Sequence, residues 1–386
     1  MTKTATRRLA SAGLLLPLLL WGTACNRQPS DETARVDEVV PPVFTPDELL
    51  PDDALRARID EVLDFTEARR LDAGRHAAWQ IVHGVLAFGP NFHIEVDGEL
   101  VPALRYLLDG GELRGWNLRP TDHGLEAPLE SGSNTGQGHE DQWIGYLCQS
   151  ELTADEPLVY RGKDYKLGDL VTQAQWDIRE GMEASWTLMG LCTFLPLDAT
   201  WTASDGQEWS IERIMRMELD ELNDNLPASP CGGTHRLVGL TMALNRYLAQ
   251  GHILEGIWKE VDEKIQWALT RAQRFQQADG SLSANYFERP ATTQDVADRI
   301  NSIGHTLEFI TYAIEQDRLS EPWIAKAVLR LCDLLELTRD EAVECGALYH
   351  AAHGLVLYRL RRFDAREYET PAETDVVGAA TDRATR

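Results

Sequence analysis

Helical segments of two kinds alternate along most of this 386-residue chain. Apolar residues recur at three and four positions, which is the spacing expected of helices, and strand-like alternation is scarce outside Phe92–Val96. One kind of segment has a charged face and suits a surface helix, whereas the other is rich in small and apolar residues and suits a buried helix. The charged segments span about 52–72, 99–109, 167–180, 210–224, 258–277 and 321–337, and the apolar segments span about 76–88, 139–150, 182–194, 233–249, 302–315 and 347–361.

This alternation gives six outer–inner helical hairpins. It predicts an all-α fold, an (α/α)6 toroid in which six inner helices are surrounded by six outer helices. The inner segments begin roughly 45 to 70 residues apart, which suits hairpins joined by loops of variable length. An open helical solenoid would show the same alternation, so the pattern leaves closure into a ring open.

The first 24 residues have the layout of a secretory signal peptide. Lys3 and two arginines precede an apolar run, Leu14–Trp21, which is too short to span a bilayer as a mature helix. Gly22-Thr-Ala-Cys25 follows and resembles the lipoprotein signal of bacteria, in which the cysteine receives lipid. That motif usually has leucine where this chain has Gly22, and an ordinary signal peptidase would also accept the site. Both readings predict export, either lipid-anchored through Cys25 or plainly secreted.

Four regions follow from these signals. We predict a signal peptide at 1–24, a lipid-anchored polar tether at 25–47, the toroid domain at 48–364 and a disordered polar tail at 365–386. The predicted location is therefore outside the cytoplasm, on a membrane of the cell envelope or in the periplasm. The lipid bilayer, reached through Cys25, is a predicted partner.

The charge balance limits the other partners. The chain has 62 acidic and 37 basic residues, a net charge of −25. Such an acidic surface is a poor partner for nucleic acid, so none is predicted. A glycan or another small ligand stays open as a partner.

Two short motifs resemble parts of known families. Gln276–Ser281 reads Gln-Gln-Ala-Asp-Gly-Ser and resembles the Gln-x-x-Asp-Gly-Ser turn of the terpenoid-cyclase and protein-prenyltransferase toroids. Gly304–Phe309 resembles the Gly-His-x-x-Glu-aromatic segment of the N-acylglucosamine 2-epimerases, which are also six-hairpin barrels. The second resemblance implies sugar chemistry at His305 and Glu308. In those epimerases a second histidine from a late inner helix shares the proton transfer, which here implies His350.

Polar side chains gather near the starts of the apolar segments. Five of these starts carry a histidine, and the sixth carries Glu183. In a closed barrel they would face one rim, where the positive ends of the helix dipoles favour neutral imidazole, the form that acts as a base or binds metal. The five histidines are His76, His139, His235, His305 and His350. The predicted catalytic residues are His139, His235, His305, Glu308 and His350.

Each of these histidines also has a structural interpretation, because a histidine at a helix start can simply hydrogen-bond a loop carbonyl. His83 and His353 lie one or two turns deeper and are predicted as core residues.

Ligand contacts are predicted from two loops and from aromatic residues on the apolar segments. The glycine-rich loop 131–143 offers mobile backbone and hydrogen-bonding groups where a ligand would enter. Tryptophan there could stack on a sugar ring or pack in the core. The predicted ligand-binding residues are Asn134, Trp143, Trp186 and Arg236.

No metal site is predicted, because no close-spaced ligand pair of the zinc-finger type occurs. Cys231 and His235 are nevertheless candidate zinc ligands, with His305, Cys345 or His350 as further ligands. The sequence identifies no cofactor.

Three functions remain open at this point. The first is a carbohydrate-active enzyme of the epimerase, lyase or hydrolase type. The second is a terpenoid-cyclase-like toroid that binds an apolar ligand, and the third is a non-catalytic binding scaffold. Whether the chain is an enzyme is left open.

Overall fold

The computed structural model describes residues 39–45 and 48–363. The predicted signal peptide, Cys25, most of the predicted tether and the predicted tail at 365–386 lie outside the described residues. Within the tether range, Phe44 is buried and belongs to the hydrophobic core of the domain.

The described part of the chain is mostly helical, which confirms the all-α fold class. The helices are α1 Asp52–Glu67, α2 Ala78–Phe88, α3 Ala103–Leu108, α4 Gln142–Leu147, α5 Leu167–Asp177, α6 Ser185–Phe194, α7 Ile211–Asp224, α8 Thr234–Ala249, α9 Gly256–Arg274, α10 Val296–Ala313, α11 Pro322–Leu337 and α12 Cys345–Phe363. Short 3₁₀ turns lie at Gly89–Asn91, Leu226–Ala228, Pro230–Gly233 and Gln316–Ser320. Among the described helices, none is both long and apolar enough to cross a membrane.

Four small antiparallel hairpins interrupt the helices. They pair β1 His93–Val96 with β2 Glu99–Pro102, β3 Arg119–Pro120 with β4 Leu125–Glu126, β5 Pro157–Tyr160 with β6 Lys163–Lys166, and β7 Thr200–Thr202 with β8 Glu208–Ser210. The strands β2, β6 and β8 run directly into the helices α3, α5 and α7.

One predicted helix start is wrong because of such a hairpin. The segment expected to be helical from residue 99 begins as strand β2, and α3 starts only at Ala103. Asp97 and Gly98 both have positive φ, 52° and 88°, which is the backbone of the tight turns that favour a two-residue hairpin.

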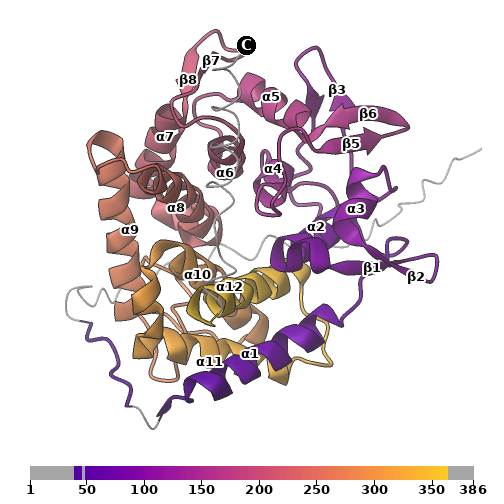
Figure 1. Ribbon diagram of the computed structural model, residues 1–386. Coiled ribbons are helices and arrows are strands. Elements are labelled where there is room, and N and C mark those ends of the chain that lie inside the picture. The colour runs from indigo at the N-terminus through magenta and orange to yellow at the C-terminus, as the bar shows by residue number, and fades with distance from the viewer. Residues whose placement is uncertain (1–38, 46–47, 364–386) are drawn as a thin grey trace, which may run out of the picture. The chain divides into compact units, whose positions relative to one another are not determined.

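Helices α2, α4, α6, α8, α10 and α12 each contact the next in this series, and α12 also contacts α2. Figure 1 shows these six helices toward the middle and α1, α3, α5, α7, α9 and α11 outside them. Each outer helix packs on at least one inner helix, as α7 does on α6 and α8. The large apolar core lies between the two sets.

The inner helices approach closely where glycine faces a neighbour. A Cβ atom on Gly304 of α10 would lie 2.7 Å from Cα of Ala351 in α12, and one on Gly354 would lie 3.1 Å from the backbone nitrogen of Glu308. These glycines therefore allow α10 and α12 to pack backbone against backbone. This contact brings the histidines of both helices together.

Candidate functional site: a buried histidine cluster

The close pair α10 and α12 builds the deeper half of the cluster around Glu308. His350 donates from Nδ1 to Glu308 Oε2 at 2.8 Å, and His353 donates from Nδ1 to Glu308 Oε1 at 2.6 Å. All three residues are buried. Both carboxylate oxygens are thus engaged by histidines three residues apart on one face of α12.

A hydroxyl from α4 extends this arrangement to α2. His83 donates from Nδ1 to the carbonyl oxygen of Trp79 at 2.5 Å, so its Nε2 accepts from the Tyr146 hydroxyl at 2.9 Å. The Tyr146 oxygen also lies 3.4 Å from His350 Nε2 and accepts from Gln142 at 3.0 Å. We call His83, Tyr146, Glu308, His350 and His353 the Glu308 network.

The electrostatics of the Glu308 network follow from its burial and pairing. Burial alone would raise the pKa of Glu308, but His350 and His353 hold that pKa well below its usual range. Burial raises the pKa of Tyr146 well above its ordinary value and lowers the pKa of His83 well below its ordinary value. The network therefore holds an ionised carboxylate, a neutral phenol and a neutral imidazole near pH 7.

A second set of side chains meets around His235, the second residue of α8. The His235 ring centroid lies 5.2 Å from that of His305, 5.4 Å from that of His139 and 5.6 Å from that of His350. Cys231, in the turn before α8, places its Sγ near the rings of His235 and His305. We call His139, Glu183, Cys231, His235 and His305 the His235 group.

His235 lacks hydrogen-bond partners although it is only 5% exposed. Neither its Nδ1 nor its Nε2 has a partner among the described residues. By contrast, His305 donates from Nδ1 to the carbonyl oxygen of Asn301 at 2.9 Å, which leaves a lone pair on Nε2. Two buried imidazoles therefore present nitrogen lone pairs inside the group.

The partly exposed edge of the His235 group is an acid–imidazole pair. His139 donates from Nδ1 to Glu183 Oε2 at 2.7 Å, and the two side chains are 24% and 21% exposed. His139 lies in the loop before α4, and Glu183 lies in the loop before α6. This pair is the part of the histidine cluster that solvent reaches most easily.

His235 and His305 are neutral for a different reason than the sequence indicated. The prediction that His305 lies at the start of an inner helix is wrong. Helix α10 begins earlier, where the Asp295 side chain caps it by accepting from the backbone nitrogens of Ala297 and Asp298. His305 therefore lies in the third turn. Burial lowers its pKa to about 3, with neighbouring His350 adding to the effect, and burial also lowers the pKa of His235 well below its ordinary value.

Other predicted site residues have structural contacts. Arg236 is buried and donates to Glu218 at 2.7 Å in an ion pair, and Glu218 also accepts from the backbone nitrogen of Ala184. Trp186 is buried with its ring centroid 4.7 Å from that of His235, so it forms a wall of the cluster. His76 lies outside the cluster and bonds to the backbone of Asp72.

Trp143 and Asn134 lie away from the cluster as well. Trp143 is buried, with its ring 5.6 Å from that of Trp116, and it lines a separate cavity. Asn134 is exposed and has a φ of 49°, so it serves the turn of its loop.

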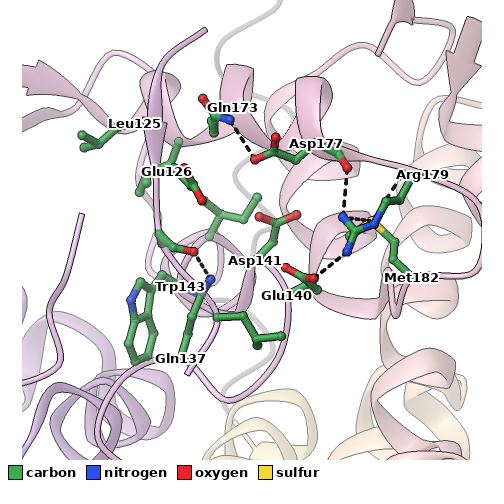
Figure 2. Close-up of a pocket in the computed structure, with 14 residues that line it drawn as sticks. Leu125, Glu126, Gln137, Glu140, Asp141, Trp143, Gln173, Asp177, Arg179 and Met182 are labelled. Carbon is green, nitrogen blue, oxygen red and sulfur yellow. Dashed lines mark hydrogen bonds and ion pairs between the residues drawn. The ribbon is translucent and has the colours of Figure 1, made fainter. Parts of the chain in front are cut away.

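The cavity beside Trp143 has a volume of about 280 Å³ and an acidic lining. Figure 2 shows Asp141 near its centre, Glu140 paired with Arg179, and Asp177 accepting from Gln173. The Asp141 carboxylate accepts from the Thr187 hydroxyl at 2.6 Å. Burial, together with the nearby charges of Glu140 and Asp177, raises the pKa of Asp141 to about 7.

Sequence reasoning missed two contributors to the cluster. Tyr146 connects His83 to His350, and His353 is the second partner of Glu308 rather than a passive core residue. The spacing of His350 and His353 was a usable signal, because residues three apart share one face of a helix. The role of Tyr146 had no comparable signal.

Comparison of the chain with protein-family models, with characterised proteins and with solved structures finds no match.

Proposed function

We propose that the described domain is a six-hairpin α/α toroid whose histidine cluster is a proton-transfer site for a small polyhydroxylated ligand. The toroid is supported by the series of inner-helix contacts, which returns from α12 to α2. An open solenoid would instead leave its first and last hairpins apart. The carbohydrate class comes from the local resemblance at Gly304–Phe309.

The observation that supports catalysis best is the hydrogen bond between His139 and Glu183. A carboxylate that accepts from Nδ1 fixes the tautomer, so the lone pair of His139 sits on Nε2. An imidazole held in this way is a general base, and it is accessible at the edge of a cluster whose other rings are buried. His139 would remove a proton from carbon beside a carbonyl or carboxylate, as an epimerase or lyase requires.

This assignment changes the roles given to the other histidines. His350 donates to Glu308 in the same way, but it is buried and its Nε2 faces the Tyr146 hydroxyl at 3.4 Å, which makes it a poor second base. We assign the Glu308 network to positioning and His139 to chemistry.

Deuterium exchange tests this proposal. The full chain is incubated in D₂O with a panel of hexosamines and uronates, and exchange of the acidic C–H proton is followed by NMR. His139→Ala and Glu183→Gln should lower the exchange rate by about a hundredfold or more, because general bases contribute factors of that size. His252→Ala, an exposed histidine after α8, is the matched control and should keep full activity. Absence of exchange with every sugar, or equal exchange in all variants, would contradict the proposal.

A non-catalytic scaffold is the second candidate, and the burial of the cluster favours it. Trp186, Tyr146 and His350 fill the space between the inner helices with their own side chains. If the protein is a scaffold, His139→Ala should lower the melting temperature and there is no turnover for it to lose. Thermal melting of His139→Ala therefore separates the two functions.

Export and lipid attachment at Cys25 complete the proposal and rest on the sequence alone. Membrane fractionation tests them, because Cys25→Ser should release the protein from the membrane fraction if the cysteine carries lipid.

A further inference from the structure

We infer that Cys231, His235 and His305 form a binding site for one zinc ion. The inference concerns the same cluster as the proposed function but does not depend on catalysis. Each of the three residues offers one ligand atom, and the three atoms lie within 4.8 Å of one another. Around tetrahedral zinc such atoms are about 3.3 to 3.8 Å apart, so small side-chain rotations would complete the site.

The lack of hydrogen-bond partners at His235 supports the zinc site most strongly. A buried imidazole with both nitrogens unpartnered is costly, because burial removes it from water without replacing its hydrogen bonds. Coordination would engage one of these nitrogens.

His305 is oriented as metal-binding histidines usually are. Its Nδ1 donates to the Asn301 carbonyl oxygen, which fixes the tautomer and leaves the lone pair of Nε2 for a metal. Histidine ligands in metalloproteins almost always donate their second nitrogen to a carbonyl or carboxylate in this way.

The turn before α8 accounts for the position of the thiol. Cys231, Gly232 and Gly233 all have positive φ, 46°, 63° and 83°. A side chain at Gly232 would collide with the ring of Tyr286, with its Cβ 2.3 Å from that ring. The left-handed turn thus brings Cys231 Sγ back toward His235, and a left-handed cysteine is an uncommon conformation that ligand binding would justify.

The chemistry of the ligands selects the ion. One thiolate and two imidazoles match zinc, and three protein ligands leave a fourth position open as in catalytic zinc sites. Cys231 is partly exposed, so an ion can enter the group from that side. His139 and Glu183 also approach His235, which would place a proton acceptor beside the ion.

Metal analysis of the purified full chain tests the inference. After incubation with zinc and dialysis against a weak chelator, the protein should retain one zinc per chain. Cys231→Ser should weaken zinc binding by about a hundredfold or more, since loss of even a supporting contact costs ten- to a hundredfold. Cys345→Ser is the matched control, because Cys345 is the other partly exposed cysteine and lies outside the ligand set.

Cobalt substitution tests the thiolate ligand in the wild-type protein itself, where the folding of a variant plays no part. Co²⁺ in place of zinc should give the thiolate-to-cobalt charge-transfer absorption in the wild type and in Cys345→Ser, and Cys231→Ser should lack it. Zinc bound without turnover would leave the site inference intact while the proposed function failed. Turnover in protein that binds no zinc would overturn the zinc site and leave the proposed function intact. The zinc site would also be overturned if Cys231→Ser left the zinc content or the cobalt spectrum unchanged.

Discussion

The Glu308 network and the His235 group adjoin each other, yet they satisfy their polar atoms in opposite ways. In the Glu308 network both carboxylate oxygens accept from histidine, and His83 uses both of its nitrogens. In the His235 group, His235 uses neither nitrogen and Glu183 Oε1 has no partner among the described residues. The difference is what leads us to propose a structural role for the first set and ligand binding for the second.

The largest expected effect is the loss of Glu308. Glu308→Ala leaves His350 and His353 buried without their acceptor, so we expect the free energy of unfolding to fall by about 3 to 5 kcal/mol. Urea denaturation measures this loss, and Glu308→Gln, which keeps an acceptor oxygen, should lose less. A loss below about 1 kcal/mol for Glu308→Ala would show that the Glu308 network does not hold the helices together.

Asp141 is a partly buried carboxyl and sharpens the comparison, because its partner is the Thr187 hydroxyl instead of two histidines. Its pKa of about 7 exceeds the unfolded value near 3.8, so the folded state holds the proton more tightly. The protonated Asp141 carboxyl therefore contributes fully to the free energy of unfolding below about pH 4, and this contribution is lost as the pH rises to about 7.

Asp141→Asn should remove this pH dependence. Asparagine cannot ionise, tolerates the φ of 56° and keeps an acceptor for Thr187. The variant should be more stable than wild type by about 4 kcal/mol at pH 8 and nearly equal at pH 4. Urea denaturation of both proteins at the two pH values measures the difference, and a constant difference would show that Asp141 stays ionised throughout.

The smallest expected effect is at His235. In chelator-treated protein, His235→Leu should leave the free energy of unfolding unchanged or raise it by about 1 kcal/mol, because it removes two unpartnered nitrogens from a buried site. Thermal melting of both proteins with and without zinc tests this expectation. Zinc should raise the melting temperature of wild type and have no effect on His235→Leu. A loss above about 2 kcal/mol without zinc would mean that His235 belongs with the structural set.

The sequence predicted the helices because their periodicity is local, and it predicted much of the cluster because histidines at similar positions in repeated hairpins converge. It could not predict pairings between separate helices. Arg236 faces Glu218 of α7 instead of a ligand, and Glu308 meets His350 and His353 only because Gly304 and Gly354 let α10 and α12 touch. Strand β1 lies within the strand-like segment Phe92–Val96, but the other hairpin strands were missed because they are two to four residues long and carry little alternation.

The contact between α12 and α2 has a consequence for biosynthesis. During translation α1 and α2 leave the ribosome first, but α12, on which both pack, is made last. Arg359 of α12 also pairs with Asp60 of α1 at 2.7 Å. The faces of α1 and α2 that pack on α12 must therefore stay uncovered until nearly the whole domain has been synthesised. This makes the nascent chain a natural client for chaperones, and it means that truncation within α12 destabilises helices at the opposite end of the domain.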